Sequence, residues 1–145
     1  MAPFSGVHLH HIARETDDVQ GLVRFYEEVL GFKRMETPSF GEIEVVWLSL
    51  PPSFSLHVIQ RNPEARLPES PLNAAPDSRK DPSSLSTGHH LSFCVADFDA
   101  CIKILKERQI PIYEKSQQNG KIKQAFFFDP DGNGLEIGNW PTPSS

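Results

Sequence analysis

The chain has 145 residues, which is enough for one ordinary domain with a buried core. Its 38% apolar and 23% charged residues are typical of a soluble globular protein, and a net charge of −5 without a basic cluster argues against nucleic-acid binding. No apolar run reaches membrane-spanning length, and the N-terminal residues lack the pattern of a secretory signal peptide. Cys94 and Cys101 do not have a disulfide-framework spacing, which favours reduced thiols and a cytoplasmic location.

The first part of the chain predicts the element order βαβββ. Alternation over residues 7–14 predicts a strand, and Asp17 or Asp18 caps a helix that ends near Leu30, before Gly31. Three further strands are predicted over 32–35, 43–50 and 54–60. We therefore interpret residues 7–60 as one module of a single domain that spans 1–145.

Residues 61–87 differ in composition from the module before them. They contain five prolines and few large apolar side chains, so we predict a long, weakly ordered loop that is the most mobile internal segment. Residues 88–139 then repeat the βαβββ order, followed by a short tail, 140–145. In this second module we predict a helix over 97–108 and strands over 89–95, around 110–113, and over 121–129 and 134–139.

The two modules are related by a shift of 79 residues. His11 and His57 are 46 residues apart, and so are His90 and Glu136, which lie 79 residues further along. Each module thus has one metal-binding residue type near its start and one near its end, which indicates a single site built twice. Three imidazoles and one carboxylate suit one divalent ion such as Zn, Ni, Co or Fe. The predicted metal ligands are His11, His57, His90 and Glu136.

The other histidines are interpreted as structural or as neighbours of the ligands. Because side chains alternate along a strand, His8 and His10 are predicted to point away from the face that carries His11, and His89 away from that of His90.

Two long motifs resemble the vicinal oxygen chelate superfamily of glyoxalase I, extradiol dioxygenases and fosfomycin-resistance proteins. They are Phe25-Tyr26 with Leu30-Gly31-Phe32, and Asp129-Pro130-Asp131-Gly132 with Glu136-Ile137. The resemblance implies an α+β fold in which two βαβββ modules form a cupped mixed sheet with the metal inside the cup. It also implies a homodimer, with the cup completed either within one chain or between subunits.

The resemblance implies an enzyme with a small-molecule substrate that is bound through two neighbouring oxygens. The leading expectation is a glyoxalase I-like lyase or isomerase (lactoylglutathione lyase) that serves methylglyoxal detoxification. It would act on the glutathione hemithioacetal of methylglyoxal through a metal-bound enediolate, with Glu136 as ligand and catalytic base. Two alternatives remain open. One is an Fe(II) extradiol dioxygenase using His11, His90 and Glu136, and the other is a protein that only binds a small ligand.

The glutathione anchors of glyoxalase I are largely replaced in this chain. The positions that carry two arginines and an asparagine in the family match Glu15, Ser86 and Arg61 here, and only Lys115 agrees with the pattern. Arg61 and Lys115 are therefore the candidate substrate-binding residues. Because Glu15 would present an anion to a carboxylate, we predict poor binding of glutathione.

Overall fold

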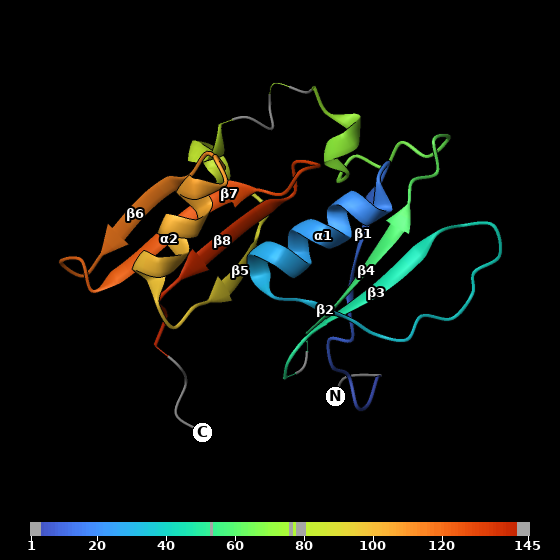
Figure 1. Cartoon of the computed structure of the whole chain (residues 1–145), viewed down its shortest axis with the longest axis horizontal. Coiled ribbons are helices and arrows are strands. Elements are labelled where there is room, and N and C mark those ends of the chain that lie inside the picture. The colour runs from blue at the N-terminus through green and yellow to red at the C-terminus, as the bar shows by residue number, and fades with distance from the viewer. Residues whose placement is uncertain (1–3, 53, 76, 78–80, 142–145) are drawn as a thin grey trace. The chain divides into compact units, whose positions relative to one another are not determined.

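The computed structural model describes residues 4–52, 54–75, 77 and 81–141. The chain divides into two compact units, residues 1–64 and 65–145, and each unit is described by itself (Figure 1).

Unit 1 contains one helix and a four-stranded mixed sheet. The strand order is β1-β4-β3-β2, with β1 parallel to β4 and the other pairs antiparallel. Its elements are β1 (Ile12–Thr16), α1 (Val19–Leu30), β2 (Lys33–Arg34), β3 (Val45–Leu50) and β4 (Phe54–Gln60).

Unit 2 repeats this arrangement after a segment whose described 3-10 helices include η1 (Pro71–Asn73) and η3 (Pro82–Thr87). Its strand order is β5-β8-β7-β6, and β5 is parallel to β8. Its strands and α-helix are β5 (Leu91–Cys94), α2 (Phe98–Glu107), β6 (Tyr113–Gln117), β7 (Ile122–Phe128) and β8 (Gly134–Gly138). The predicted α+β class with two βαβββ modules is confirmed.

The 79-residue repeat holds at the level of single residues. Ala13 pairs with His57 in unit 1, and Ser92 pairs with Glu136 in unit 2, so both parallel pairs have the same register. Each helix is also capped in the same way. The side chain of Asp18 accepts a hydrogen bond from Gly21 N at 3.0 Å, and the side chain of Asp97 accepts one from Ala100 N at 3.1 Å.

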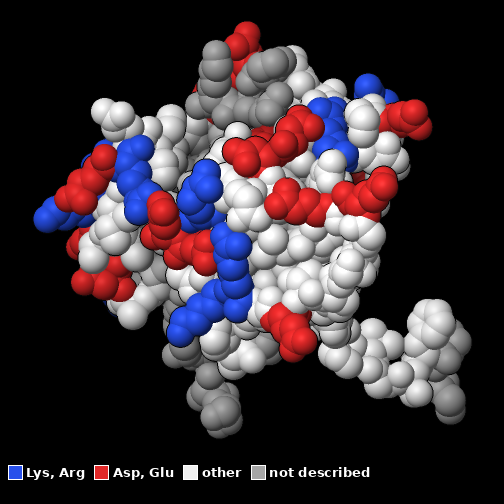
Figure 2. Space-filling model, turned by 45° about the vertical axis from the view of Figure 1, so that its right-hand side comes forward, with Lys and Arg blue, Asp and Glu red and all other residues white. Residues whose placement is uncertain are grey.

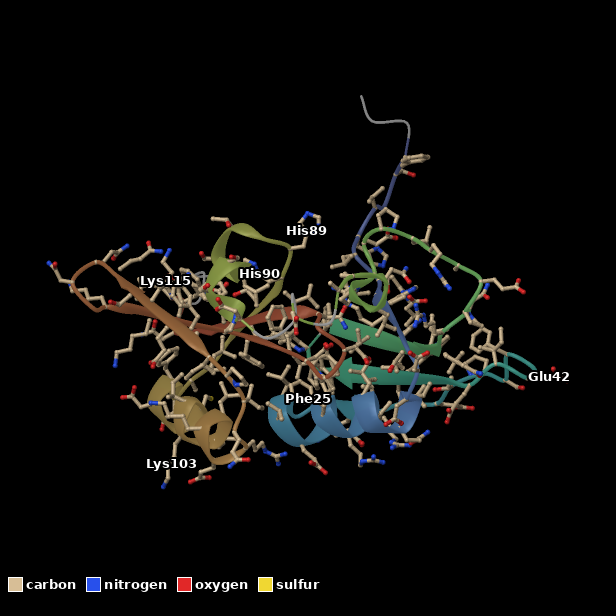
Figure 3. All side chains as sticks on the ribbon, turned by 90° about the horizontal axis from the view of Figure 1, so that it is seen from above. Phe25, Glu42, His89, His90, Lys103 and Lys115 are labelled. Carbon is tan, nitrogen blue, oxygen red and sulfur yellow. The ribbon has the colours of Figure 1, made fainter. Side chains whose placement is uncertain are left out.

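Each unit buries one face of its sheet together with the apolar stripe of its helix. Figure 3 shows α2, with Lys103 on its outer side, on one side of the unit 2 sheet, and His90 and Lys115 on the opposite side. The buried apolar residues of unit 1 include Val19, Leu22, Val23, Tyr26, Leu48, Leu56 and Val58. Those of unit 2 include Phe98, Ile102, Leu105, Ala125, Phe127, Leu135 and Ile137. Because strand side chains alternate, the opposite face of each sheet carries the candidate ligands.

Two predicted strands are misplaced. The strand predicted over 7–14 begins only at Ile12, where its pairing with Leu56 of β4 starts. The strand predicted around 110–113 lies later, in β6. Ile110 N instead donates to Leu105 O and completes the end of the helix, while the polar residues of β6 pair with β7.

The end of the predicted loop is ordered and packed. Asp81 caps η3 by accepting a hydrogen bond from Ser83 N at 3.0 Å, and Pro82 occupies its first turn. Pro82 and Leu85 are buried in unit 2, so residues 82–87 belong to this unit. The interpretation of 61–87 as one loop is therefore wrong for residues 82–87, which form η3, and the expected mobility of the segment stays a prediction.

In the part of the chain that the structure describes, no helix is long and apolar enough to cross a membrane. Figure 2 shows that acidic and basic side chains are interspersed on one face of the molecule.

Candidate metal-binding residues

Unit 1 brings His11 and His57 into direct ring contact. His11 directly precedes β1, and the side-chain alternation of the strand places it on the face of Ala13, whose partner in β4 is His57. The two imidazole rings are stacked, with centroids 3.8 Å apart and an interplanar angle of 10°. Trp47, opposite His57 on β3, stacks on His57 at 4.3 Å and 7°. His57 is therefore held between the rings of Trp47 and His11.

The surroundings of His57 favour the neutral imidazole. Burial lowers the pKa of His57 below its ordinary value of 6.5, and the neighbouring His11 and His10 lower it further. The neutral form has a nitrogen lone pair, which is the form that binds a metal ion.

His10 is not directed away from His11, as the strand pattern had predicted. The Nδ1 atoms of the two residues are 2.8 Å apart, and their rings meet edge to face. This contact uses Nδ1 of His11 and leaves its Nε2 for another partner. The prediction was wrong because residues 7–11 do not form part of β1.

Unit 2 brings His90 and Glu136 together. His90 Nε2 lies 3.2 Å from Glu136 Oε1, and the Glu136 side chain is 4% exposed. Two donors about 2.1 Å from one ion lie about 3.0 Å apart at a right angle and about 3.4 Å apart at a tetrahedral angle. The observed separation lies between these values, so both atoms can bind the same ion.

The hydrogen bond on the other nitrogen of His90 sets its tautomer. Nδ1 lies 2.9 Å from the carbonyl oxygen of Gly88, and because a carbonyl oxygen only accepts, Nδ1 carries the hydrogen. The other ring nitrogen, Nε2, lies beside Glu136 Oε1, and a backbone carbonyl on the remote nitrogen is typical of metal-binding histidines.

Two glutamines on this face were not among the predicted site residues. Gln124 Nε2 donates to Glu136 Oε2 at 2.7 Å, and Gln117 Nε2 donates to Gln124 Oε1 at 2.9 Å. Gln124 and Glu136 are both buried. The signal in the sequence was the alternation of Ile122, Gln124 and Phe126, which places a glutamine on an otherwise apolar strand face.

Residues 8–137 match the family model described as the Glyoxalase/Bleomycin resistance protein/Dioxygenase superfamily. The chain belongs to this superfamily. It is 27% identical over 136 residues to Glyoxylase I 4 of Arabidopsis thaliana, covering 90% of this chain and 70% of that protein. The structure of a glyoxalase family protein from Enterococcus faecalis is 27% identical, with a TM-score of 0.63 and coverage of 93% and 99%. A glyoxalase/dioxygenase from Nostoc punctiforme has a TM-score of 0.67 at 24% identity, with coverage of 98% and 97%.

A divalent metal ion needs several ligand side chains that lie close together. Among the described residues, no three His, Cys, Asp or Glu side chains gather to hold an ion. Each unit instead brings two candidate metal ligands together. The pair in unit 1 is two imidazoles, and the pair in unit 2 is an imidazole and a carboxylate. The tautomer of His90 and the lowered pKa of His57 suit a borderline ion such as Zn, Ni, Co or Fe.

The candidate substrate-binding residues have different surroundings. Arg61 donates to Asp17 at 3.2 Å, and the side chain of Arg61 is 18% exposed, so a neighbouring carboxylate already faces its charge. Lys115 is exposed on β6 and pairs with Gln124 on β7, which places it on the face that carries Glu136. Figure 3 shows Lys115 and His90 on the same side of the unit 2 sheet.

A cavity of about 430 Å³ lies beside the histidines of unit 1. It is lined by His10, His11, Phe40, Ile43, Val45, Trp47, His57 and Ile59. Among the described residues that line it, the polar groups are the three imidazoles and the indole N–H of Trp47, and there is no lysine or arginine. Its volume falls within the range of small-molecule sites, about 300–1,000 Å³.

Proposed function

We propose that this chain is a glyoxalase I-like metalloenzyme that acts on a small substrate with two neighbouring oxygens. The observation that carries the proposal is the His90–Glu136 pair, in which an imidazole nitrogen and a carboxylate oxygen converge at 3.2 Å. The stacked His11 and His57 occupy the equivalent positions of the repeat. In this proposal, His11, His57, His90 and Glu136 hold one divalent ion, which requires the two pairs to meet within one chain or between two copies in a homodimer.

The chemistry assigns separate tasks to the ion and to Glu136. A bound divalent ion supplies polarisation of the two substrate oxygens, which makes a hydrogen on the adjoining carbon more acidic. Glu136 is the one carboxylate in the set, so it is both ligand and general base. Because Gln124 donates to Oε2, Oε1 is the oxygen of Glu136 that would bind the ion, and it would accept the proton only after release from the ion.

The cavity of unit 1 supports a substrate with an apolar substituent. Phe40, Ile43 and the ring of Trp47 offer contacts to a hydrocarbon or a ring, and the lining residues that the structure describes include no lysine or arginine to bind a carboxylate. Glutathione adducts carry two carboxylates, which need cations. Asp17 faces the Arg61 guanidinium, and Glu15 lies on β1. We therefore expect a glutathione adduct to bind more weakly than a substrate with an apolar substituent.

A dioxygenase is the second candidate, because His11, His90 and Glu136 also make the two-histidine, one-carboxylate set of non-haem iron oxygenases. A ligand-binding protein without activity is the third. The free thiols of Cys94 and Cys101 support our proposal of a cytoplasmic location.

The test combines metal content with an activity panel. Protein purified without added metal is analysed for bound ions, then loaded separately with Zn²⁺, Ni²⁺, Co²⁺ or Fe²⁺. Each form is assayed with methylglyoxal plus glutathione, with phenylglyoxal plus glutathione, with either dicarbonyl alone, and with catechols under oxygen. Isomerase activity supports the proposal, and oxygen uptake with iron replaces it with the dioxygenase. Metal binding without turnover leaves the ligand-binding protein, and failure to bind any of the four ions overturns the metal site.

A further inference from the structure

The glutamines beside Glu136 form a directed chain of hydrogen bonds. Gln117 Nε2 donates to Gln124 Oε1 at 2.9 Å, and Gln124 Nε2 donates to Glu136 Oε2 at 2.7 Å. A carboxylate only accepts hydrogen bonds when ionised, so the amide of Gln124 must turn its nitrogen towards Glu136. Gln117 fixes that orientation because its own NH₂ group takes up the carbonyl end of Gln124.

The register of the sheet explains why these side chains meet. Phe126 on β7 lies directly opposite Glu136 on β8, and Gln124 is two residues earlier on the same face. Gln117 pairs with Ile122, which places it on the same face at the end of β6. The backbone pairing of three adjacent strands, β6, β7 and β8, therefore brings the three hydrogen-bonded side chains together.

This chain of hydrogen bonds gives the two carboxylate oxygens of Glu136 different partners. Oε2 accepts the amide hydrogen of Gln124, whereas Oε1 lies 3.2 Å from His90 Nε2. The terminal torsion of a glutamate side chain has a broad, roughly two-fold profile, so the covalent geometry alone does not fix which oxygen faces the metal. The bond from Gln124 supplies this selection, and the burial of both residues shields it from competing water.

We propose that Gln124 is a positioning residue that reserves Oε1 of Glu136 for the metal and keeps this ligand monodentate, with Gln117 holding Gln124 in the required orientation. This inference rests on the proposed metal site. Outer hydrogen bonds of this kind commonly affect metal affinity or activity by about 10–100-fold.

The test measures metal affinity and coordination, not turnover. The variants are Gln124→Leu, Gln117→Leu and the double variant, and the control is Lys123→Leu. Lys123 is the neighbour of Gln124 on β7, but its side chain points to the other face and contacts Asp99 at 3.4 Å. Zn²⁺ affinity is measured by competition with a chromophoric chelator, and coordination by the visible absorption spectrum of the Co²⁺ form. Circular dichroism verifies that each variant is folded.

We expect Gln124→Leu to weaken Zn²⁺ binding by about 10–100-fold and to change the Co²⁺ spectrum as Glu136 rotates. Gln117→Leu should weaken binding by less, and it should add nothing in the Gln124→Leu background, because it acts through Gln124. Lys123→Leu should bind as the unmodified protein does. Because Gln117 is exposed, we expect Gln117→Leu to fold, so this variant tests the hydrogen-bonded glutamines even if Gln124→Leu does not fold.

The outcomes separate this inference from the proposed function. Equal affinity and an unchanged spectrum in Gln124→Leu would overturn the positioning role and leave the metal site intact. Additive losses in the double variant would overturn the directed chain through Gln124. Absence of metal binding by the unmodified protein would overturn both the proposed function and this inference.

Discussion

Leu85 links the segment between the two modules to His90 of unit 2. It is 8% exposed in η3, and its side chain lies against Gly134, where an added Cβ would sit 2.5 Å from Leu85 Cδ2. Leu85 O also accepts the backbone hydrogen bond of Gly88, whose own carbonyl holds His90 Nδ1. We predict that Leu85→Ala lowers both the stability of the protein and its metal affinity.

The magnitude follows from the volume removed. The change deletes three carbon groups, and at about 0.8 kcal/mol for each buried group the transfer cost is about 2.4 kcal/mol. Buried Leu→Ala changes range from about 2 to 5 kcal/mol, and a short helix at the surface can settle into the gap, which favours the lower end. A loss of about 2.5 kcal/mol corresponds to a fall of roughly 5–10 °C in Tm for a protein of this size.

Leu67 provides a matched control in the same segment. Its side chain is 60% exposed, so Leu67→Ala should change the free energy of unfolding by less than about 0.5 kcal/mol. Both variants are compared by thermal and denaturant unfolding of the metal-free protein. Equal effects of the two substitutions would show that η3 contributes nothing to the core of unit 2, and the reasoning about Leu85 would fail.

Four further predictions concern the site and the titrating groups. Glu136→Gln and His90→Ala should each weaken Zn²⁺ binding and abolish proton transfer, and full activity in both variants would refute the site assignment. Calorimetry of the metal-loaded protein with S-hexylglutathione should give weak binding, whereas sub-micromolar affinity would restore an ordinary glutathione site. Maleimide should modify exposed Cys94 before Cys101, since burial and then the nearby Asp97 raise the pKa of the Cys101 thiol. Because the pKa of His57 lies below 6.5 in the folded metal-free protein, its contribution to stability is present above about pH 6.5 and lost as the pH falls below that value. His57→Gln should reduce this slope, and identical pH profiles would contradict the assigned shift.

The repeat made the topology predictable because it relates residues with the same structural task. Asp18 and Asp97 cap the two helices, and Ala13–His57 and Ser92–Glu136 pair in the same register. A shift of 79 residues between such positions is visible in the sequence alone. The strand predicted around 110–113 was misplaced because β6 itself is mostly polar. The apolar residues at 110 and 112, which precede it, have the alternation that is typical of a strand.

The hydrogen-bonded surroundings of the candidate ligands could not be predicted from the sequence. His11, His57, His90 and Glu136 stand out by residue type and spacing, but the partners of each depend on backbone register. A shift of one residue between β7 and β8 would turn Gln124 to the other face of the sheet. The contact between His10 and His11 likewise depends on where β1 begins, which pairing with β4 decides.

The two pairs of candidate ligands have different residue types at equivalent positions of the repeat. In unit 1, a buried histidine is held between two rings, where burial disfavours its protonated form. In unit 2, the corresponding position is a carboxylate that accepts a hydrogen bond from the amide of Gln124. Unit 1 thus has two imidazoles at the repeated positions, and unit 2 has one imidazole and one carboxylate. The repeat therefore keeps the positions of the candidate ligands, and the difference between His57 and Glu136 gives unit 2 the one carboxylate of the set.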